Sequence, residues 1–424
     1  MTVFVSQHYS QLFYWALCTQ KSTQMTKEDK SFILNAGLEH AVDLLRHPPS
    51  TQGELPDYFS EHGIGELATL DLLAPYVLGG ATYLDSSDAL AHMDPPTPWI
   101  TWATTLWNAR LNQNLLHPAT APFAIKAERK VIDWLAPVFG MNGGHMCSGS
   151  TVANLTALWA ARDAKKIDRI VASKAAHISI EKAAKILGLP YEQISTNSQG
   201  QIDRNKLGDI SKACLVLTAG TTATGVIDSL ALVGQAKWTH VDAAWAGPLR
   251  LSPAHGDLLD GIEKADSVAV SAHKWLFQPK DSALIMFRQP EIANPAISFA
   301  GGYLATPNIG IQGSRGASAI PLLATMMAWG KKGITQRIDH SMSMATMLAT
   351  ELSKDERISV WAMPKTGVTV FRPLTMSTEA LYQRLPQGML STCIVDDQKW
   401  LRSVAANPLA DIDKILCAIN QAME

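Results

Sequence analysis

The sequence predicts an α/β protein built around a mostly parallel β-sheet, with a smaller α+β domain at its C-terminal end. Between about residues 143 and 290, short apolar segments of strand length alternate with segments of helix length, a pattern typical of a parallel sheet. After about residue 320 the pattern changes to a long helix, an apolar strand and a closing helix. The 424-residue chain is long enough for more than one domain.

The individual elements are predicted from apolar periodicity and from glycine and proline breaks. A helix is expected before the alternating region over 26–46, where His47-Pro48-Pro49 ends it. Further helices are expected at 121–138, 151–166, 179–187, 229–236, 317–352 and 409–423, and strands at 168–172, 191–194, 213–218, 237–241, 266–270, 282–287 and 368–372.

Composition excludes several classes of protein. The formal net charge is −2 and no basic block is present, so no nucleic-acid partner is expected. No run of 18 apolar residues and no signal-peptide pattern are found, so neither a membrane span nor secretion is expected. The five cysteines are scattered and lack metal-ligand spacing, which favours a reducing, cytoplasmic setting and no metal site.

Two polar residues stand at the ends of apolar strands about thirty residues apart. Lys274 follows the strand over 266–270, and Asp242 follows the strand over 237–241. Neighbouring strand ends of an open α/β sheet are where ligands bind. Pyridoxal phosphate (PLP) enzymes need a lysine amine that forms a Schiff base and an acid that holds the pyridinium proton. Lys274 and Asp242 supply both, although an ordinary lysine or aspartate at a strand end is the alternative.

A phosphate-binding turn is predicted upstream of this pair. Ser148-Gly149-Ser150-Thr151 directly precedes the helix over 151–166. Its backbone N–H groups and the helix N-terminus favour an anion, although an ordinary helix cap has the same composition. We therefore expect Gly149, Ser150 and Thr151 to bind the cofactor phosphate, with Ser271 and His273 as further candidates on the phosphate side.

With these motifs in order, the chain resembles the group II PLP-dependent amino acid decarboxylases, the family of glutamate, aromatic amino acid and diaminobutyrate decarboxylases. The resemblance is carried by Ala272-His273-Lys274-Trp275 and Asp242-Ala243-Ala244-Trp245, and it runs from about residue 112 to 286. It implies that Ala244 packs on one face of the PLP ring and that His177 stacks on the other. It also implies that a threonine of the turn over 220–225, for which we choose Thr221, approaches the phenolic oxygen.

The resemblance implies PLP fold type I, with a large mixed seven-stranded sheet domain and a small C-terminal α+β domain. The corresponding boundaries are an N-terminal helical segment over 1–110 that locks two subunits, a PLP-binding domain over 111–316 and a small domain over 317–424. Such enzymes are homodimers with active sites at the subunit interface.

The implied reaction is removal of the α-carboxylate of an L-amino acid, followed by proton delivery to the α-carbon. In many relatives a loop tyrosine delivers that proton. The register of the loop places the usual tyrosine nearer Thr306, so Tyr303 in a shifted register, His177 or water is each a candidate. The catalytic set is therefore Lys274, Asp242, His177 and Tyr303. A carbon–carbon lyase of the sphingosine-phosphate type, an aldehyde-forming decarboxylase, a PLP-binding protein without activity and a structural protein remain alternatives.

The substrate pocket is expected to include the loop around residues 112–122. Asn114 and His117 are candidates to meet a polar side chain, and Arg315 is a candidate to meet a carboxylate. Each has surface or structural hydrogen bonding as its alternative. The set mildly favours an acidic or small polar L-amino acid over an aromatic one.

Overall fold

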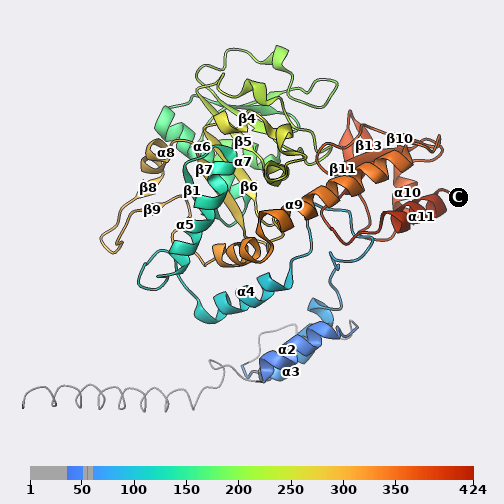
Figure 1. Cartoon of the computed structure of the whole chain (residues 1–424), viewed down its shortest axis with the longest axis horizontal. Coiled ribbons are helices and arrows are strands. Elements are labelled where there is room, and N and C mark those ends of the chain that lie inside the picture. Colours follow the sequence, from blue (N-terminus) through green and yellow to red (C-terminus); the bar gives the residue numbers. More distant parts are fainter. Residues whose placement is uncertain (1–35, 51–54, 56–60) are drawn as a thin grey trace, which may run out of the picture. The chain divides into compact units, whose positions relative to one another are not determined.

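The computed structural model describes residues 36–50, 55 and 61–424 (Figure 1), and the chain divides into two compact units between Thr82 and Tyr83. In the first unit α2 (Gly37–Arg46) contacts α3 (Glu66–Val77), and His40 lies 2.6 Å from the Asp71 carboxylate. The helix predicted over 26–46 is present from Gly37 and ends before the two prolines. The beginning of that prediction and the apolar N-terminal segment lie outside the described residues.

A seven-stranded mixed sheet forms the centre of the second unit (Figure 1). The strand order is β1-β7-β6-β5-β4-β2-β3, with β7 antiparallel to both its neighbours. The parallel pairs β5–β6, β4–β5, β2–β4 and β2–β3 confirm the mostly parallel sheet that the alternation predicts. The strands are β1 (Gly143–Cys147), β2 (Ile170–Ser173), β3 (Tyr191–Ile194), β4 (Cys214–Thr218), β5 (Trp238–Asp242), β6 (Ser267–Ser271) and β7 (Ala283–Phe287).

Both faces of the sheet are covered, because successive side chains of each strand point to opposite faces. In β4, Leu215 joins the apolar core on the side of α5 and α9, whereas Val216 joins the core under α6 and α7. The five inner strands are therefore buried along their whole length, whereas the edge strands β1 and β3 are partly exposed. The helices are α4 (Trp99–Leu111), α5 (Ala124–Leu135), α6 (Ser150–Lys165), α7 (Ile178–Leu187), α8 (Pro290–Ala296) and α9 (Ala319–Leu352).

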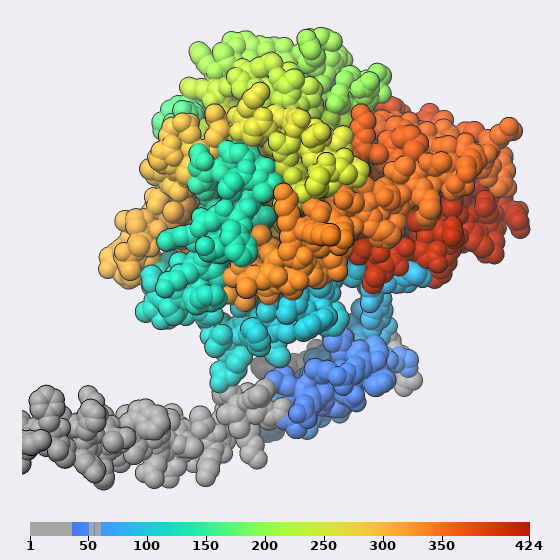
Figure 2. Space-filling view, in the orientation of Figure 1, coloured from blue at the N-terminus to red at the C-terminus, as the bar shows by residue number. Residues whose placement is uncertain are grey.

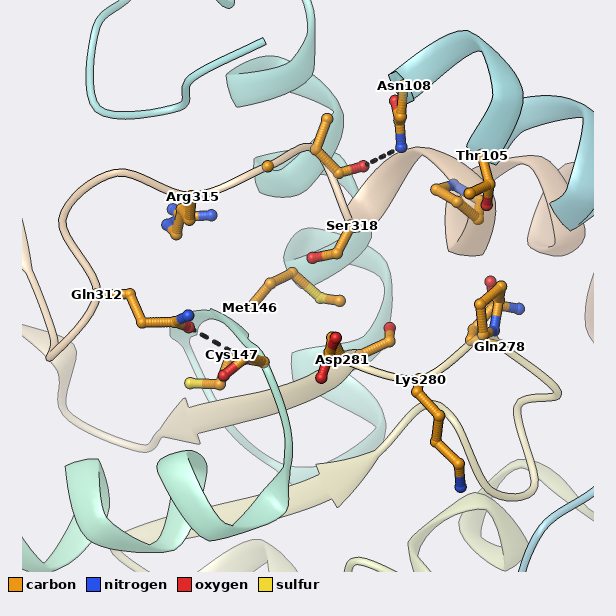
Figure 3. Close-up of a pocket in the computed structure, with 16 residues that line it drawn as sticks. Thr105, Asn108, Met146, Cys147, Gln278, Lys280, Asp281, Gln312, Arg315 and Ser318 are labelled. Carbon is orange, nitrogen blue, oxygen red and sulfur yellow. Dashed lines mark hydrogen bonds between the residues drawn. The ribbon is translucent and has the colours of Figure 1, made fainter. Parts of the chain in front are cut away.

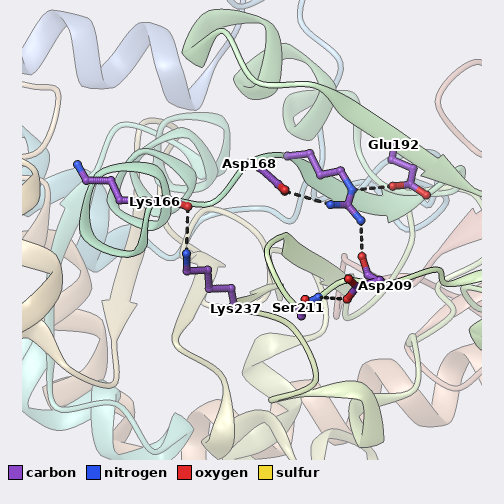
Figure 4. A network of polar contacts seen from close by, with 7 residues as sticks. Lys166, Asp168, Glu192, Asp209, Ser211 and Lys237 are labelled. Carbon is purple, nitrogen blue, oxygen red and sulfur yellow. Dashed lines mark hydrogen bonds and ion pairs between the residues drawn. The ribbon is translucent and has the colours of Figure 1, made fainter.

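Charged residues join the amino-terminal end of β2 to its surroundings (Figure 4). The Arg169 guanidinium donates to Glu192 of β3 at 2.9 Å, to Asp168 at 3.0 Å and to the backbone oxygen of Asp209. Partly exposed pairs of this kind contribute little to stability each. Because they lie at the amino-terminal end of the strand, they leave the carboxyl-terminal edge of the sheet free for a site.

Two predicted helices differ from the structure. The helix predicted over 229–236 is wrong: only a single 3₁₀ turn, Leu230–Leu232, forms there, and Gly234 follows with φ at +85°. The long helix predicted over 317–352 is present as α9, but it is kinked at Gly330, where φ is +60° and ψ is 179°. Glycine adopts this backbone conformation without a Cβ clash.

The small C-terminal sheet is antiparallel, with the order β10-β11-β13-β12. Its core is shared with the second half of α9 and with α11, which packs against α9. This arrangement confirms the small α+β domain. Its elements are β10 (Ile358–Val360), β11 (Val368–Pro373), α10 (Thr378–Arg384), β12 (Ser391–Val395), β13 (Gln398–Val404) and α11 (Ile412–Met423).

Two buried tryptophans connect the large sheet to the small domain. Trp245 and Trp275 stack with their ring centroids 4.1 Å apart. The Trp245 indole donates to the backbone oxygen of Thr366, and the Trp275 indole donates to that of Ala405. Since each tryptophan follows a strand end of the large sheet by only a few residues, this stack fixes both strand-end loops against the small domain.

We expect Gly367→Ala to destabilise the fold by about 3 kcal/mol, the cost of overpacking a core. A Cβ at Gly367, where φ is +72°, would lie 2.6 and 2.8 Å from the Cζ2 and Cη2 atoms of Trp275. Urea unfolding measures the change, with Gly208→Ala as the control because a Cβ there has no neighbour within 4 Å. Equal stability of the two variants would contradict the close packing of Trp275.

Candidate active site

The sheet brings Lys274 and Asp242 to one edge. Strands β5 and β6 are parallel neighbours, so Asp242 at the end of β5 and the turn after β6 that carries Lys274 lie at the same carboxyl-terminal edge. Burial lowers the pKa of the Lys274 amine, and the nearby negative charge of Asp242 opposes that shift. A partly desolvated amine of this kind is a usable nucleophile near neutral pH.

The Asp242 carboxylate is buried and held on both oxygens. Its Oδ1 accepts from the backbone N–H of Ala244 at 3.1 Å, and its Oδ2 accepts from Nδ2 of Asn154 at 2.9 Å. Asn154 comes from α6 and is fully buried. Two donors stabilise the ionised form of the carboxylate, which is the form needed beside a protonated ring nitrogen.

His177 lies on the same side of the site as Asp242. It is the N-cap residue of α7, and its Nδ1 accepts from the backbone N–H of Ser179 at 3.2 Å. Burial lowers the pKa of His177. The negative charge of Asp242 raises this pKa, and the positive charge of Lys274 lowers it, so the three side chains share one electrostatic environment. The structure thus brings together Lys274, Asp242 and His177, with buried Ala244 two residues beyond the carboxylate.

The predicted phosphate turn lies beside His273. Gly149 begins α6, and a Cβ placed on it would lie 4.0 Å from Cε1 of the His273 ring. The first helical turn leaves the amides of Ser150 and Thr151 without intrahelical acceptors. Among the described residues, Ser271 Oγ and His273 Nδ1 are buried without any hydrogen-bond partner. Unpaired buried polar atoms require an explanation, and a phosphate group with several acceptor oxygens supplies one, so these residues fit PLP.

Thr221 is buried in the turn after β4, but its hydroxyl has partners within that turn. It lies 3.0 Å from the Thr224 hydroxyl and accepts from the backbone N–H of Val226 at 3.1 Å. Its role toward the phenolic oxygen of the cofactor stays a prediction.

The four substrate-side and proton-donor candidates lie near one another. The backbone N–H of Leu115, next to Asn114, donates to the backbone oxygen of Arg315 at 3.0 Å, and that of His117 donates to the backbone oxygen of Asn114 at 3.2 Å. Asn114 donates to the Ser314 hydroxyl at 3.1 Å, and the rings of His117 and Tyr303 are 6.3 Å apart. Tyr303 is 74% exposed, in the loop between β8 (Ser298–Phe299) and β9 (Asn308–Ile309), which Figure 2 shows extending from the body of the large domain. Among the contacts of the described residues, none joins this group to Lys274.

The Arg315 side chain pairs with the carboxylate of Glu128, a residue that the sequence analysis did not identify. Its guanidinium forms a two-point ion pair with Glu128 of α5, which is 7% exposed. Both Arg315 and Ser148 line a cavity of about 390 Å³ beside the phosphate turn (Figure 3), and Gln312 accepts there from the Ser148 amide at 3.0 Å. Lys274 and Asp242 do not line this cavity. The role of Arg315 toward a substrate carboxylate stays a prediction.

The structure adds residues that the motif analysis did not assign. Arg402 of β13 is buried and donates to the backbone oxygens of Thr222 and Ala91 and to the Ser391 hydroxyl. No carboxylate of the described residues lies within ion-pair distance of it, although its charge acts on Lys274. Two further additions are Asn154 and His240, which are fully buried polar residues of α6 and β5. Their neighbours in the sequence include threonines, so no local pattern identifies them.

Comparison with known proteins agrees with this geometry. Residues 73–373 match the model of the pyridoxal-dependent decarboxylase conserved domain. The chain therefore belongs to the pyridoxal-dependent decarboxylase family, which confirms the resemblance, and it is a carboxy-lyase that uses pyridoxal 5′-phosphate as its cofactor.

Among curated relatives, L-2,4-diaminobutyrate decarboxylase of Rhizobium meliloti is 29% identical over 86% of this chain and 83% of its own length. Aspartate 1-decarboxylase of Aliivibrio fischeri is 27% identical, over 78% of this chain and 70% of its own length. The crystal structure of mouse CSAD superposes with a TM-score of 0.82 at 21% identity, covering 91% of this chain and 98% of that one. This likeness confirms the fold class, fold type I.

No helix in residues 36–50 or 61–424 has the length and apolar character needed to cross a bilayer. Within the same part of the chain, no three histidine, cysteine or acidic side chains gather as metal ligands would.

The Arg315–Glu128 pair gives a test of what Arg315 does. We expect Arg315→Met to destabilise the fold by about 3 kcal/mol, because it leaves a buried carboxylate unpaired. The double variant Arg315→Met/Glu128→Gln should recover most of that loss, as measured by chemical unfolding in a double-mutant cycle. A single variant of unchanged stability with a greatly raised KM would instead favour contact with the substrate.

Proposed function

We propose that this chain decarboxylates an L-amino acid at a PLP site in which Lys274 carries the cofactor and Asp242 holds the ring nitrogen. The observation that supports the proposal is the shared carboxyl-terminal edge of β5 and β6, where a desolvated amine and a buried two-donor carboxylate share one electrostatic environment with His177 at the start of α7. The unpaired Ser271 and His273 atoms beside Gly149 support the phosphate position.

Each residue has a distinct part in this proposal. When bound, the cofactor supplies an electron sink for the pair released as the carboxylate leaves. Asp242 keeps the ring nitrogen protonated, and Ala244 and His177 hold the two ring faces. Gly149, Ser150 and Thr151 hold the phosphate together with Ser271 and His273, which fixes the orientation of the reacting bond. Thr221 is proposed at the phenolic oxygen.

We propose an acidic or small polar L-amino acid as the substrate. Buried Arg402 has no carboxylate partner among the described residues, and its charge acts on Lys274, so it suits a substrate carboxylate. Relatives are named for diaminobutyrate, aspartate and cysteine sulfinic acid, but others are named for aromatic amino acids. Asn114, His117 and Arg315 stay proposed contacts of the substrate side chain.

We also propose that the chain works as a homodimer with active sites at the interface. Along α4 the side chains of Trp99, Leu106, Trp107 and Leu111 are exposed, an apolar surface that is unusual on a monomer. A partner chain would also bring the group of His117 and Tyr303 toward an opposite site, which would allow Tyr303 to deliver the proton to the α-carbon. The free, scattered cysteines support a cytoplasmic location.

The proposal is tested first with Lys274→Ala and Asp242→Asn. The native protein should show a visible absorbance band with PLP, and that band should shift and CO₂ appear with one member of a panel of L-amino acids. Lys274→Ala should lose both the band and turnover. Asp242→Asn should still form the band at saturating PLP, although with weaker affinity, and should lose at least about 100-fold in kcat, since a neutral partner no longer favours the protonated ring.

Lys237→Ala is the matched control, because Lys237 is an exposed lysine at the opposite, amino-terminal end of β5, where its amine bonds to the backbone oxygen of Lys166. It should keep the band and turnover. A native band that shifts without CO₂ would replace decarboxylation by a lyase or transaminase reaction. Absence of any band, or full activity of Lys274→Ala, would contradict the site itself.

The dimer is tested with Trp107→Glu/Leu111→Glu, which places two charges on the exposed apolar face of α4. We expect light scattering to give the mass of two 46.0-kDa chains for the native protein and of one for this variant. Leu409→Glu, at an equally exposed leucine elsewhere, should remain dimeric. A dimeric α4 variant would contradict this interface.

A further inference from the structure

We propose that Asn154 is a positioning residue that holds Asp242 as a carboxylate, through a buried hydrogen-bond chain whose direction is fixed from Trp238 to Asp242. The inference rests on the proposed function, since it assigns the support of the residue that faces the ring nitrogen. The hydrogen bonds of this chain join four elements, β5, β6, α6 and α7.

The Asp242 end fixes the orientation of the Asn154 amide. A carboxylate only accepts hydrogen bonds, so the atom of Asn154 that lies 2.9 Å from Asp242 Oδ2 is the NH₂ group. The amide oxygen then faces Nε2 of His240 at 3.0 Å. Because an amide oxygen cannot donate, His240 must carry its proton on Nε2.

The opposite end of the chain requires the same proton position. An indole N–H only donates, and that of Trp238 points to the Ser267 hydroxyl oxygen at 2.9 Å. This leaves the Ser267 hydroxyl hydrogen for Nδ1 of His240, also at 2.9 Å. Nδ1 therefore accepts, and the ring is neutral with its proton on Nε2. Burial lowers the pKa of His240 to about 4, which keeps it neutral at physiological pH.

The same amide also reaches His177. The second N–H of Asn154 donates to the Ser179 hydroxyl at 3.0 Å, and that hydroxyl lies 2.8 Å from Nδ1 of His177. The backbone N–H of Ser179 donates to the same Nδ1. Nδ1 of His177 thus accepts twice, and the ring presents an Nε2–H group. Asn154 therefore uses both of its N–H groups, toward Asp242 and Ser179, and its oxygen accepts from His240.

A neutral donor at this position has an electrostatic consequence. The groups facing Asp242 are the Asn154 amide from α6, the Ala244 amide, His177 from α7, Lys274 after β6 and His240 on its own strand. Both histidines are neutral in this hydrogen-bond pattern. Asn154 thus stabilises the charge of Asp242 without adding a competing charge or a removable proton, so the shared proton stays on the ring nitrogen.

Two substitutions of similar size separate this role from packing. Asn154→Leu removes the hydrogen bonds at every pH, and we expect a fall in PLP affinity and in kcat of about 10- to 100-fold each, the effect of losing a hydrogen bond to a charged group. Asn154→Asp can replace the amide only while the new carboxyl group is protonated, because a second carboxylate would repel Asp242. Its PLP affinity, followed by absorbance titration of the apoprotein and divided by the native value at each pH, should therefore fall steeply as pH rises through about 5 to 8, the range in which a buried carboxyl group ionises.

Thr156→Val is the control, since Thr156 is equally buried on α6 but its hydroxyl bonds to the Val152 backbone oxygen and the Cys147 thiol rather than to Asp242. It should bind PLP as the native protein does. The inference would be overturned by PLP affinity that is unchanged in Asn154→Leu. It would also be overturned if the PLP affinity of Asn154→Asp, relative to the native protein, did not change with pH. If the native protein binds no PLP, the proposed function fails instead.

A measurement on the native apoprotein needs neither the Asn154 variants nor the cofactor. In protein labelled with ¹⁵N-histidine, with His240→Gln used to assign the signals, His240 should show a protonated Nε2 and an unprotonated Nδ1 from about pH 6 to 8, above its lowered pKa. A proton on Nδ1, or a doubly protonated ring in this range, would contradict the proposed hydrogen-bond chain. This test stays valid if the Asn154 variants do not fold.

Discussion

The parallel pairing of β5 with β6 is the constraint on which the rest of this site depends. Neighbouring parallel strands end at the same edge of the sheet. The residues that follow them therefore lie close together, independently of the path of the chain between the two strands. Asp242 ends one strand and Lys274 follows the other, in register through pairs such as Asp242 with Ala269. The Trp245–Trp275 stack then fixes both loops against the small domain.

Burial explains why so much of the site is organised by hydrogen bonds. The desolvation cost of a buried carboxylate must be compensated by hydrogen bonds. Asp242 accepts two of them, from the Asn154 side chain and the Ala244 backbone, whereas apolar side chains at the strand end could donate none. The same burial lowers the pKa values of Lys274, His177 and His240. A desolvated amine and neutral rings around a single stabilised carboxylate suit a cofactor whose ring nitrogen must stay protonated.

The fold and the centre of the site could be predicted from sequence because they depend on local patterns. Alternating apolar strands and helices predict the parallel sheet, and Lys274 and Asp242 are visible as polar residues at strand ends. The helix expected at 229–236 failed because only a 3₁₀ turn forms before Gly234. Asn154 and Glu128 were missed because their importance comes from partners 88 and 187 residues away, and long-range pairing leaves no local periodicity.

Covalent attachment of PLP to Lys274 is the central claim. The most direct test is reduction of the PLP-loaded protein with borohydride, followed by mass spectrometry of its peptides. We predict a single modified lysine, Lys274, directly after the Ser271–His273 turn. Modification of a different lysine, such as neighbouring Lys280, or of none, would contradict the claim.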